Sequence, residues 1–338
     1  MPRLIGMDEA GLGPNLGPFV VAVTVWDVPD SPFEFDFWRT FDEVLTNSPK
    51  PNEIRLHVAD SKQVFQPKRG FADLERSVLA ALQLNELHPK SFDELCQILS
   101  PNDPTMESAK ELKHPQPMPR VPELTNHQRD EPAPGLSPWN CGPATALPSQ
   151  PHNFSIVESW KRICERQKIR LVAIKAAIIE PQRFNELIRQ YDNKSLVVSR
   201  TAFQLLRSVW APDETETFVV GDKHGGRNRY DDLLAEVLDD EMIFRLEEGA
   251  DRSDYRVGKT VLRFQPRAEE HGPVALASMT AKYVRELAMT QFNHFWVKHI
   301  PGLKPTQGYP VDAKRFRDQI ASKQRELNIS DDVLWRNR

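Results

Sequence analysis

Apolar and polar residues follow two different spacings along this chain, and each spacing is typical of one kind of secondary structure. Short β-branched runs bounded by glycine or proline are typical of strands, whereas apolar residues three and four positions apart are typical of helices. The first pattern predicts strands at residues 3–7, 19–26, 170–179, 217–222 and 256–264. The second predicts helices at residues 67–84, 156–167, 181–188, 196–209, 230–238 and 274–296. Strands that alternate with helices after an opening hairpin predict a mixed α/β sheet covered by helices.

Residues 100–151 interrupt this alternation with about a dozen prolines and few aliphatic residues. Proline removes backbone donors, and the segment has little apolar surface to bury, so we expect a loop or disordered insertion there. The insertion separates residues 1–99 from residues 152–328, which we expect to form one domain. Residues 329–338 are expected to form a C-terminal tail.

The composition predicts a globular protein, because 39% of the 338 residues are apolar and can form a core. No apolar run approaches the roughly 18 residues of a membrane span, and an acidic pair interrupts the N-terminus before a signal peptide could form. A soluble, cytoplasmic protein is therefore expected. Cys96, Cys141 and Cys164 are odd in number and lack C-x-x-C spacing, which indicates neither a disulfide framework nor a zinc site.

Charge is unevenly distributed along the chain. The formal net charge of −4 argues against a general polyanion-binding protein. From residue 282 onward, however, basic residues outnumber acidic residues by five. This excess is typical either of a surface that follows a phosphate backbone or of a solvated helix face, and charge alone does not decide between them.

The segment most informative about chemistry is residues 7–18, Met-Asp-Glu-Ala-Gly-Leu-Gly-Pro-Asn-Leu-Gly-Pro. It places the adjacent carboxylates of Asp8 and Glu9 at the end of a strand, followed by three glycines with accessible backbone amides. Carboxylate oxygens are the ligands that Mg²⁺ prefers, and phosphate oxygens complete its coordination. The segment therefore indicates a site for a metal and a phosphate, or else an ordinary tight hairpin with solvated acids.

These residues resemble the opening motif of the ribonuclease HII family, or type 2 ribonuclease H, except that Leu12 stands where the family has arginine. Further elements of the family follow in the same order and cover nearly the whole chain outside the insertion. They are Asp60-Ser61-Lys62, Glu180-Pro181, Asp222 after a strand, residues 277–285, and Gly308-Tyr309-Pro310.

The resemblance implies a ribonuclease H-like fold and an endonuclease that hydrolyses the RNA strand of RNA/DNA hybrids to 5′-phosphate and 3′-hydroxyl ends. It implies that two Mg²⁺ or Mn²⁺ ions are held by catalytic carboxylates at positions matching Asp8, Glu9, Asp222 and Glu269. Glu269 replaces an aspartate of the family, and Glu270 is the alternative ligand. The implied substrate-binding residues are Gly11, Gly13, Lys62, Ser278, Lys282 and Tyr309. The implied partner is an RNA/DNA hybrid or a ribonucleotide-containing duplex, bound by a monomer.

Two departures from the family pattern leave alternatives open. Leucine at position 12 makes none of the charge-assisted phosphate contacts of an arginine, so the preference for single ribonucleotides is in question. The alternatives are a catalytically impaired hybrid-binding relative and an enzyme similar to ribonuclease HIII that prefers longer RNA tracts. His224, in a glycine-rich loop, is interpreted as solvent-facing in preference to a proton shuttle.

Overall fold

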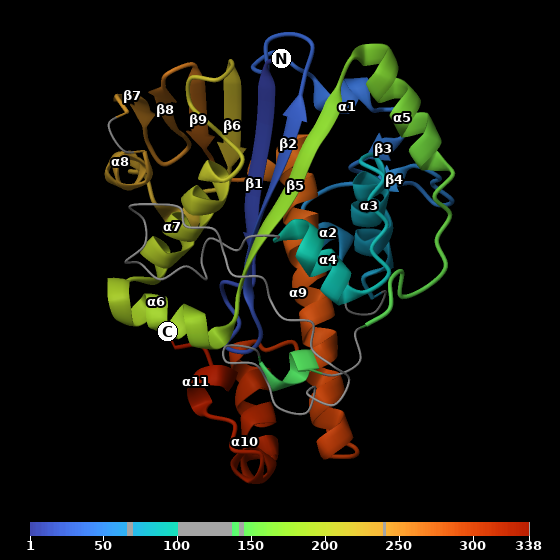
Figure 1. Ribbon diagram of the computed structural model, residues 1–338, viewed down its shortest axis with the longest axis vertical. Coiled ribbons are helices and arrows are strands. Elements are labelled where there is room, and N and C mark those ends of the chain that lie inside the picture. The colour runs from blue at the N-terminus through green and yellow to red at the C-terminus, as the bar shows by residue number, and fades with distance from the viewer. Residues whose placement is uncertain (66–69, 101–136, 142–144, 239–240, 338) are drawn as a thin grey trace, which may run out of the picture.

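The computed structural model describes residues 1–65, 70–100, 137–141, 145–238 and 241–337. A seven-stranded sheet forms the centre of this part of the chain (Figure 1). Strand β1 (Arg3–Ala10), third in the strand order, pairs antiparallel with β2 (Phe19–Asp27) and parallel with β6 (Thr217–Gly221). Beyond β2 the sheet ends with the antiparallel strand β5 (Arg170–Ile179). Beyond β6 follow the parallel strand β9 (Thr260–Phe264) and the antiparallel strands β8 (Ser253–Val257) and β7 (Ile243–Glu248).

The prediction of a mixed α/β sheet covered by helices is confirmed. The prediction of one strand over residues 256–264 is wrong, because the chain reverses at Gly258, where φ is +53°, and forms the hairpin β8–β9. The apolar alternation continues through this tight turn and conceals it. Strand β7 was not predicted, because this edge strand is mostly exposed and lacks the alternation of a half-buried strand.

Helices cover both faces of the sheet (Figure 1). One face, lined by Leu4, Ala22 and Trp26, forms a core with a group of helices. These are α1 (Phe37–Thr40), α2 (Ser61–Val64), α3 (Ala72–Gln83), α4 (Phe92–Leu99), α5 (Ile156–Gln167) and α9 (Gly272–His299). The opposite face, lined by Ile5 and Val23, packs against α6 (Pro181–Tyr191), α7 (Lys194–Arg207) and α8 (Asp231–Val237). A small parallel pair, β3 (Leu45–Thr46) and β4 (Leu56–His57), lies apart from the sheet.

Most predicted helices agree with the observed ones, and the agreement is complete for α5. Residues 66–69, at the start of one predicted helix, lie outside the described residues, and α3 begins at residue 72. Residues 101–136 and 142–144 of the expected insertion also lie outside them, so that expectation stays a prediction. None of the described helices combines the length and the apolar character that crossing a membrane requires.

The helix α9 lies directly against β1. A Cβ atom added at Gly6 would lie 2.2 Å from the carbonyl carbon of Pro273. Such a distance is shorter than any real carbon contact, so only glycine permits this approach. The contact fixes the first turns of α9 over β1, and these turns carry Ser278 and Lys282.

A third cluster of buried residues lies beyond the end of the sheet, around the second half of α9. It includes Trp139 of the 3₁₀ turn η1 (Pro138–Cys141) and residues of α10 (Pro310–Glu326) and α11 (Asp331–Leu334). Figure 1 shows α10 and α11 side by side at this end of the molecule. Asn185 of α6 donates from Nδ2 to the carbonyl oxygen of Trp335 at 2.7 Å, which attaches the C-terminal segment to the second face.

Candidate functional site

Strand β1 places Asp8 and Glu9 near its end, and the parallel register with β6 places Asp222, the residue after β6, beside them. Successive side chains of a strand point to opposite faces. Asp8 is buried on the side of α9, where Ser278 hydrogen-bonds to its carboxyl group. Glu9 is half-buried on the other side of the strand.

Asp222 and Glu269 come from neighbouring connections at the same edge of the sheet. The carboxylate of Asp222 accepts hydrogen bonds from the backbone amides of Lys223 and Ala268. Ala268 begins the 3₁₀ turn η3 (Ala268–Glu270), so its amide brings Glu269 close to Asp222. Glu270 is exposed, and its charge acts instead on the neighbouring His271. Glu269, rather than Glu270, therefore belongs to the group around Asp222.

The carboxyl groups disfavour one another's ionisation. Burial, followed by the charge of Glu9, raises the pKa of Asp8 well above its ordinary value. Burial and the charge of Asp222 raise the pKa of Glu9 to about 7. Burial also raises the pKa of Glu269, with contributions from Asp60 and Asp222. Since like charges in a desolvated site oppose ionisation, these side chains share one region of negative potential.

Lys62 faces the same region from α2. Partial burial opposes its charge, but Asp60, Asp8, Glu269 and Asp222 together raise its pKa. Its ammonium in turn lowers the pKa of Glu9, although burial dominates there. Lys62 thus acts as a counter-ion to carboxylates from four separate segments.

The donor set fits a hard divalent cation in its chemistry, because carboxylate oxygens are the ligands of Mg²⁺ and Mn²⁺ and their repulsion would be relieved by positive charge. The side chains do not converge fully. Among the described residues, no three His, Cys, Asp or Glu side chains are grouped closely enough to hold a metal ion. Asp8 and Glu9 on opposite sides of one strand account for part of this separation.

Two predicted phosphate contacts on α9 have protein partners. Ser278 is buried and donates from Oγ to Ser61 Oγ at 3.1 Å, which connects α9 to α2 beside Asp8. The ammonium of Lys282 lies 2.7 Å from Glu286 Oε1 and 4.5 Å from the centre of the Phe65 ring. Ser278 therefore lies beside Asp8, whereas Lys282, one helical turn further along α9, is paired with Glu286.

The loop of residues 11–17, called the glycine loop below, lies beside Tyr309. Gly11 adopts φ +90°, and a Cβ atom there would lie 2.7 Å from Arg285 Nε. A Cβ atom at Gly13 would lie 3.9 Å from Tyr309 Cε1. Tyr309 is 49% exposed, so its ring and the loop form one accessible patch at the end of β1.

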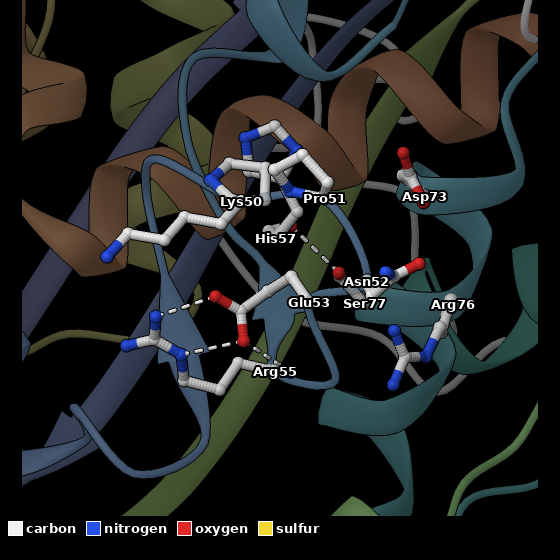
Figure 2. A pocket seen from close by; sticks show the side chains of 10 residues that line it. Lys50, Pro51, Asn52, Glu53, Arg55, His57, Asp73, Arg76 and Ser77 are labelled. Carbon is white, nitrogen blue, oxygen red and sulfur yellow. Dashed lines mark hydrogen bonds and ion pairs between the residues drawn. The ribbon is translucent and has the colours of Figure 1, made fainter.

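Two pockets differ in their relation to this site. One, of about 420 Å³, is lined by Asp222, Lys223 and Arg267 among others, and it opens beside the carboxylates. The other, of about 490 Å³, lies between the segment 49–57 and α3 and contains none of the predicted site residues (Figure 2). Figure 2 shows Arg55 paired with Glu53 at its edge. The second pocket is therefore separate from the carboxylate site.

The interpretation of His224 as solvent-facing is wrong. The side chain is 2% exposed, and its Nδ1 lies 3.0 Å from Ser199 Oγ. The turn at Gly225, with φ +61°, directs the ring into an aromatic cluster that contains Phe203 and Phe264. Burial, helped by the charge of Arg227, lowers the pKa of His224 to about 3, so the ring is neutral and structural.

Sequence reasoning assigned no site role to three charged residues that lie near the site: Asp60, Arg285 and Arg336. Asp60 caps α2 by accepting from the amide of Lys62 at 2.9 Å, and its position next to a predicted site residue was the available signal. Arg285 and Arg336 lie buried under the glycine loop. Arg336 belongs to the C-terminal segment, and no motif in the sequence connects it with the loop.

No protein-family model and no curated protein matches this chain. Solved structures are distantly similar. Ribonuclease H2 from Pyrococcus horikoshii OT3 is 12% identical over 98% of this chain and 92% of that one, with a TM-score of 0.42. Aquifex aeolicus ribonuclease H3 is 14% identical over 98% and 70%, with a TM-score of 0.40. Bst ribonuclease HIII, in complex with Mn²⁺, is 15% identical over 98% and 65%, with a TM-score of 0.39. Similarity of this degree says nothing about activity.

Proposed function

We propose that this protein is a divalent-metal-dependent endonuclease that cleaves the RNA strand of RNA/DNA hybrids, leaving 5′-phosphate and 3′-hydroxyl ends. The observation that carries the proposal is the interaction of Asp8, Glu9, Asp222 and Glu269 around Lys62. Residues far apart in the sequence place these groups at one edge of the sheet, next to an exposed glycine loop and tyrosine. Burying several carboxylates close together destabilises the fold, and ionisable groups with such perturbed pKa values are concentrated at functional sites.

The four carboxylates would hold two Mg²⁺ or Mn²⁺ ions. Bound there, the ions supply a polarised water for in-line attack and stabilise the leaving 3′ oxygen. The protein's own contribution is to supply oxygen ligands from rigid strands and short turns, with Ser278 orienting the carboxyl group of Asp8. To hold a shared ion, the side chains of Asp8 and Glu9 would have to rotate toward each other.

Substrate recognition is proposed at the patch beside the carboxylates. Backbone amides of residues 11–13 and the phenol of Tyr309 would read the ribose 2′-hydroxyl, which distinguishes RNA from DNA at one nucleotide. Lys62 would contact a phosphate next to the metal ions. Lys282 would reach a phosphate only after leaving Glu286. The protein is proposed to bind its duplex as a monomer.

A second candidate is a hybrid-binding protein without catalytic activity. It is favoured by the incomplete convergence of the carboxylates within the described residues and by the leucine at position 12. A related alternative keeps catalysis but prefers longer RNA tracts, because Leu12 provides no phosphate contact to hold a single ribonucleotide in register.

Cleavage assays distinguish these possibilities. The purified chain is incubated with a full RNA/DNA hybrid or with a DNA duplex that contains one ribonucleotide, in Mg²⁺ or Mn²⁺. The proposal predicts metal-dependent cutting of at least one substrate. Metal-independent binding without cutting would select the binding protein, and cutting of the full hybrid alone would select the preference for longer tracts. Glu269→Ala should abolish cutting, whereas Glu270→Ala, a change at the exposed neighbour, should not.

A further inference from the structure

The glycine loop is held from inside by guanidinium groups. Arg336 donates from Nη2 to the carbonyl oxygens of Gly11 and Pro14. Arg285 donates from Nη2 to the carbonyl oxygen of Leu16 at 3.3 Å. The backbone amides of Leu12 and Gly13 donate no hydrogen bond to any described residue. The carbonyl oxygens of Gly11, Pro14 and Leu16 are therefore satisfied inside the protein, while two consecutive amide donors remain available for an outside acceptor.

The C-terminal segment delivers Arg336 to this position through backbone pairing. Trp335 forms an antiparallel bridge with Leu16. The amide of Arg336 donates to the carbonyl oxygen of Asn15 at 2.8 Å, and Asn15 Nδ2 donates to the carbonyl oxygen of Arg336 at 3.3 Å. The guanidinium then lies over the ring of Phe184, 5.0 Å from its centre. The arginine is thus fixed along both its backbone and its side chain.

Placing this cation in the interior is costly. Arg336 is 1% exposed, and its Nε and Nη1 have no hydrogen-bond partner among the described residues. Burial lowers its pKa to about 9, and the neighbouring charge of Arg285 contributes. The carboxylate of Glu180 offsets only part of this effect. An apolar side chain would fill the same space at lower cost, so packing alone does not explain an arginine here.

We infer that Arg336 is a positioning residue, which holds residues 11–14 in the conformation that presents the amides of Leu12 and Gly13 to the substrate. The inference rests on the proposed function for the identity of the substrate, but the effect on the loop does not depend on it. Arg336 contacts the carbonyl groups of the loop, whereas the amides of Leu12 and Gly13 are the groups that would contact the substrate.

The test compares full-length wild type with Arg336→Met, which keeps most of the stem and removes the donors, and with Arg336→Lys, which keeps one cationic donor group. Amide hydrogen exchange measures the loop directly. In Arg336→Met the amides of Asn15 and Leu16, which donate to the carbonyl oxygen of Gly308 in wild type, should exchange at least about tenfold faster, whereas the central strands stay protected. Arg336→Lys should fall between Arg336→Met and wild type.

Arg317→Met is the matched control. Arg317 lies over the ring of Trp335, 5.0 Å from its centre, and pairs with Asp331, so it supports the same segment without touching the loop. This variant should leave loop exchange unchanged. In the cleavage assay, Arg336→Met should lose about tenfold more kcat/KM on the single-ribonucleotide duplex than on the full hybrid, because one misplaced loop matters most when one 2′-hydroxyl is read.

Three results would overturn the inference. They are unchanged loop exchange in Arg336→Met, equal loop exchange in Arg336→Met and Arg317→Met, and global unfolding of both Arg336 variants, since the proposed role is local. If wild type cuts neither substrate, the proposed function fails, but the exchange measurement still decides whether Arg336 positions the loop.

Discussion

Asp8 is the residue at which stability and the proposed chemistry oppose each other most directly. Its carboxyl is buried and its pKa is raised, so ionisation as the pH rises past its ordinary value weakens the fold. Asp8→Asn should therefore raise Tm at neutral pH without divalent ions, and abolish cleavage. It should also remove the increase in Tm that Mg²⁺ produces in wild type, because a ligand is lost.

Thermal unfolding with and without Mg²⁺ checks this prediction, and Glu270→Gln serves as the control at an exposed carboxylate of the same region. Unchanged turnover in Asp8→Asn would remove Asp8 from the metal site. A drop in Tm without metal would show that the carboxylate stabilises the fold.

His224 predicts a sensitivity to acid that is unrelated to the metal site. Its pKa of about 3 lies below the ordinary value of 6.5, so the unfolded chain takes up a proton before the folded one does. The stability that this histidine contributes is present above pH 6.5 and is lost as the pH falls toward 3. His224→Gln should flatten the decline of Tm over this range, while His294→Gln, at an exposed histidine, should not. Equal slopes of Tm against pH in wild type and His224→Gln would contradict the prediction.

Among the elements, the contact between α9 and β1 tolerates the least change. Gly6→Ala would insert a methyl group into the backbone of Pro273 and separate the helix from the strand. We expect a loss of about 3 kcal/mol in the free energy of unfolding, because relieving the overlap moves two closely packed backbone segments apart. Urea denaturation measures it. Gly249→Ala, where the nearest atom to an added Cβ is 3.6 Å away, should cost far less, and equal losses would contradict this account.

The elements that follow a strong apolar pattern were predictable from the sequence. The helix α5 and the strand β5 have their predicted bounds, because both bury a regular set of apolar side chains. The edge strand β7 and the turn at Gly258 were not predictable, since exposure removes the alternation that marks a strand and tight turns leave it intact. Helix α10 was missed because most of its surface is polar.

The candidate site was predictable as a set of residue types but not as an arrangement. The motif order identified Asp8, Asp222 and Glu269, whose mutual influence follows from the parallel register. Which side of β1 each carboxylate occupies depends on pairing, and the burial of His224 depends on one turn. The contribution of Arg336 depends on a contact across almost the whole sequence, and no local pattern encodes such a contact.

In the whole molecule, Asn185 joins the second face of the sheet to the C-terminal segment. Its buried amide donates to the carbonyl oxygens of Asp332 and Trp335, and its Oδ1 accepts from the amide of Asn337 at 2.7 Å. Asn185→Ala should lower the free energy of unfolding by about 3 kcal/mol, because buried backbone groups lose their partners. It should also speed amide hydrogen exchange in residues 331–337.

Arg189→Ala is the matched control, because this arginine pairs with the same Asp332 at the surface, where water screens the interaction. Little change is expected in the free energy of unfolding or in exchange of the C-terminal segment. If both variants behaved alike in denaturation and exchange, the buried amide would not be the attachment point.

The bridge between Leu16 and Trp335 also constrains when the molecule can mature during synthesis. The first hairpin leaves the ribosome early, yet the loop at its tip lacks its last backbone partners until residues 335 and 336 have been translated. Domains otherwise form progressively from the N-terminus as they emerge. A nascent chain would thus carry an unfinished glycine loop until residues 335 and 336 have left the ribosome, so this loop would mature later than the hairpin that carries it.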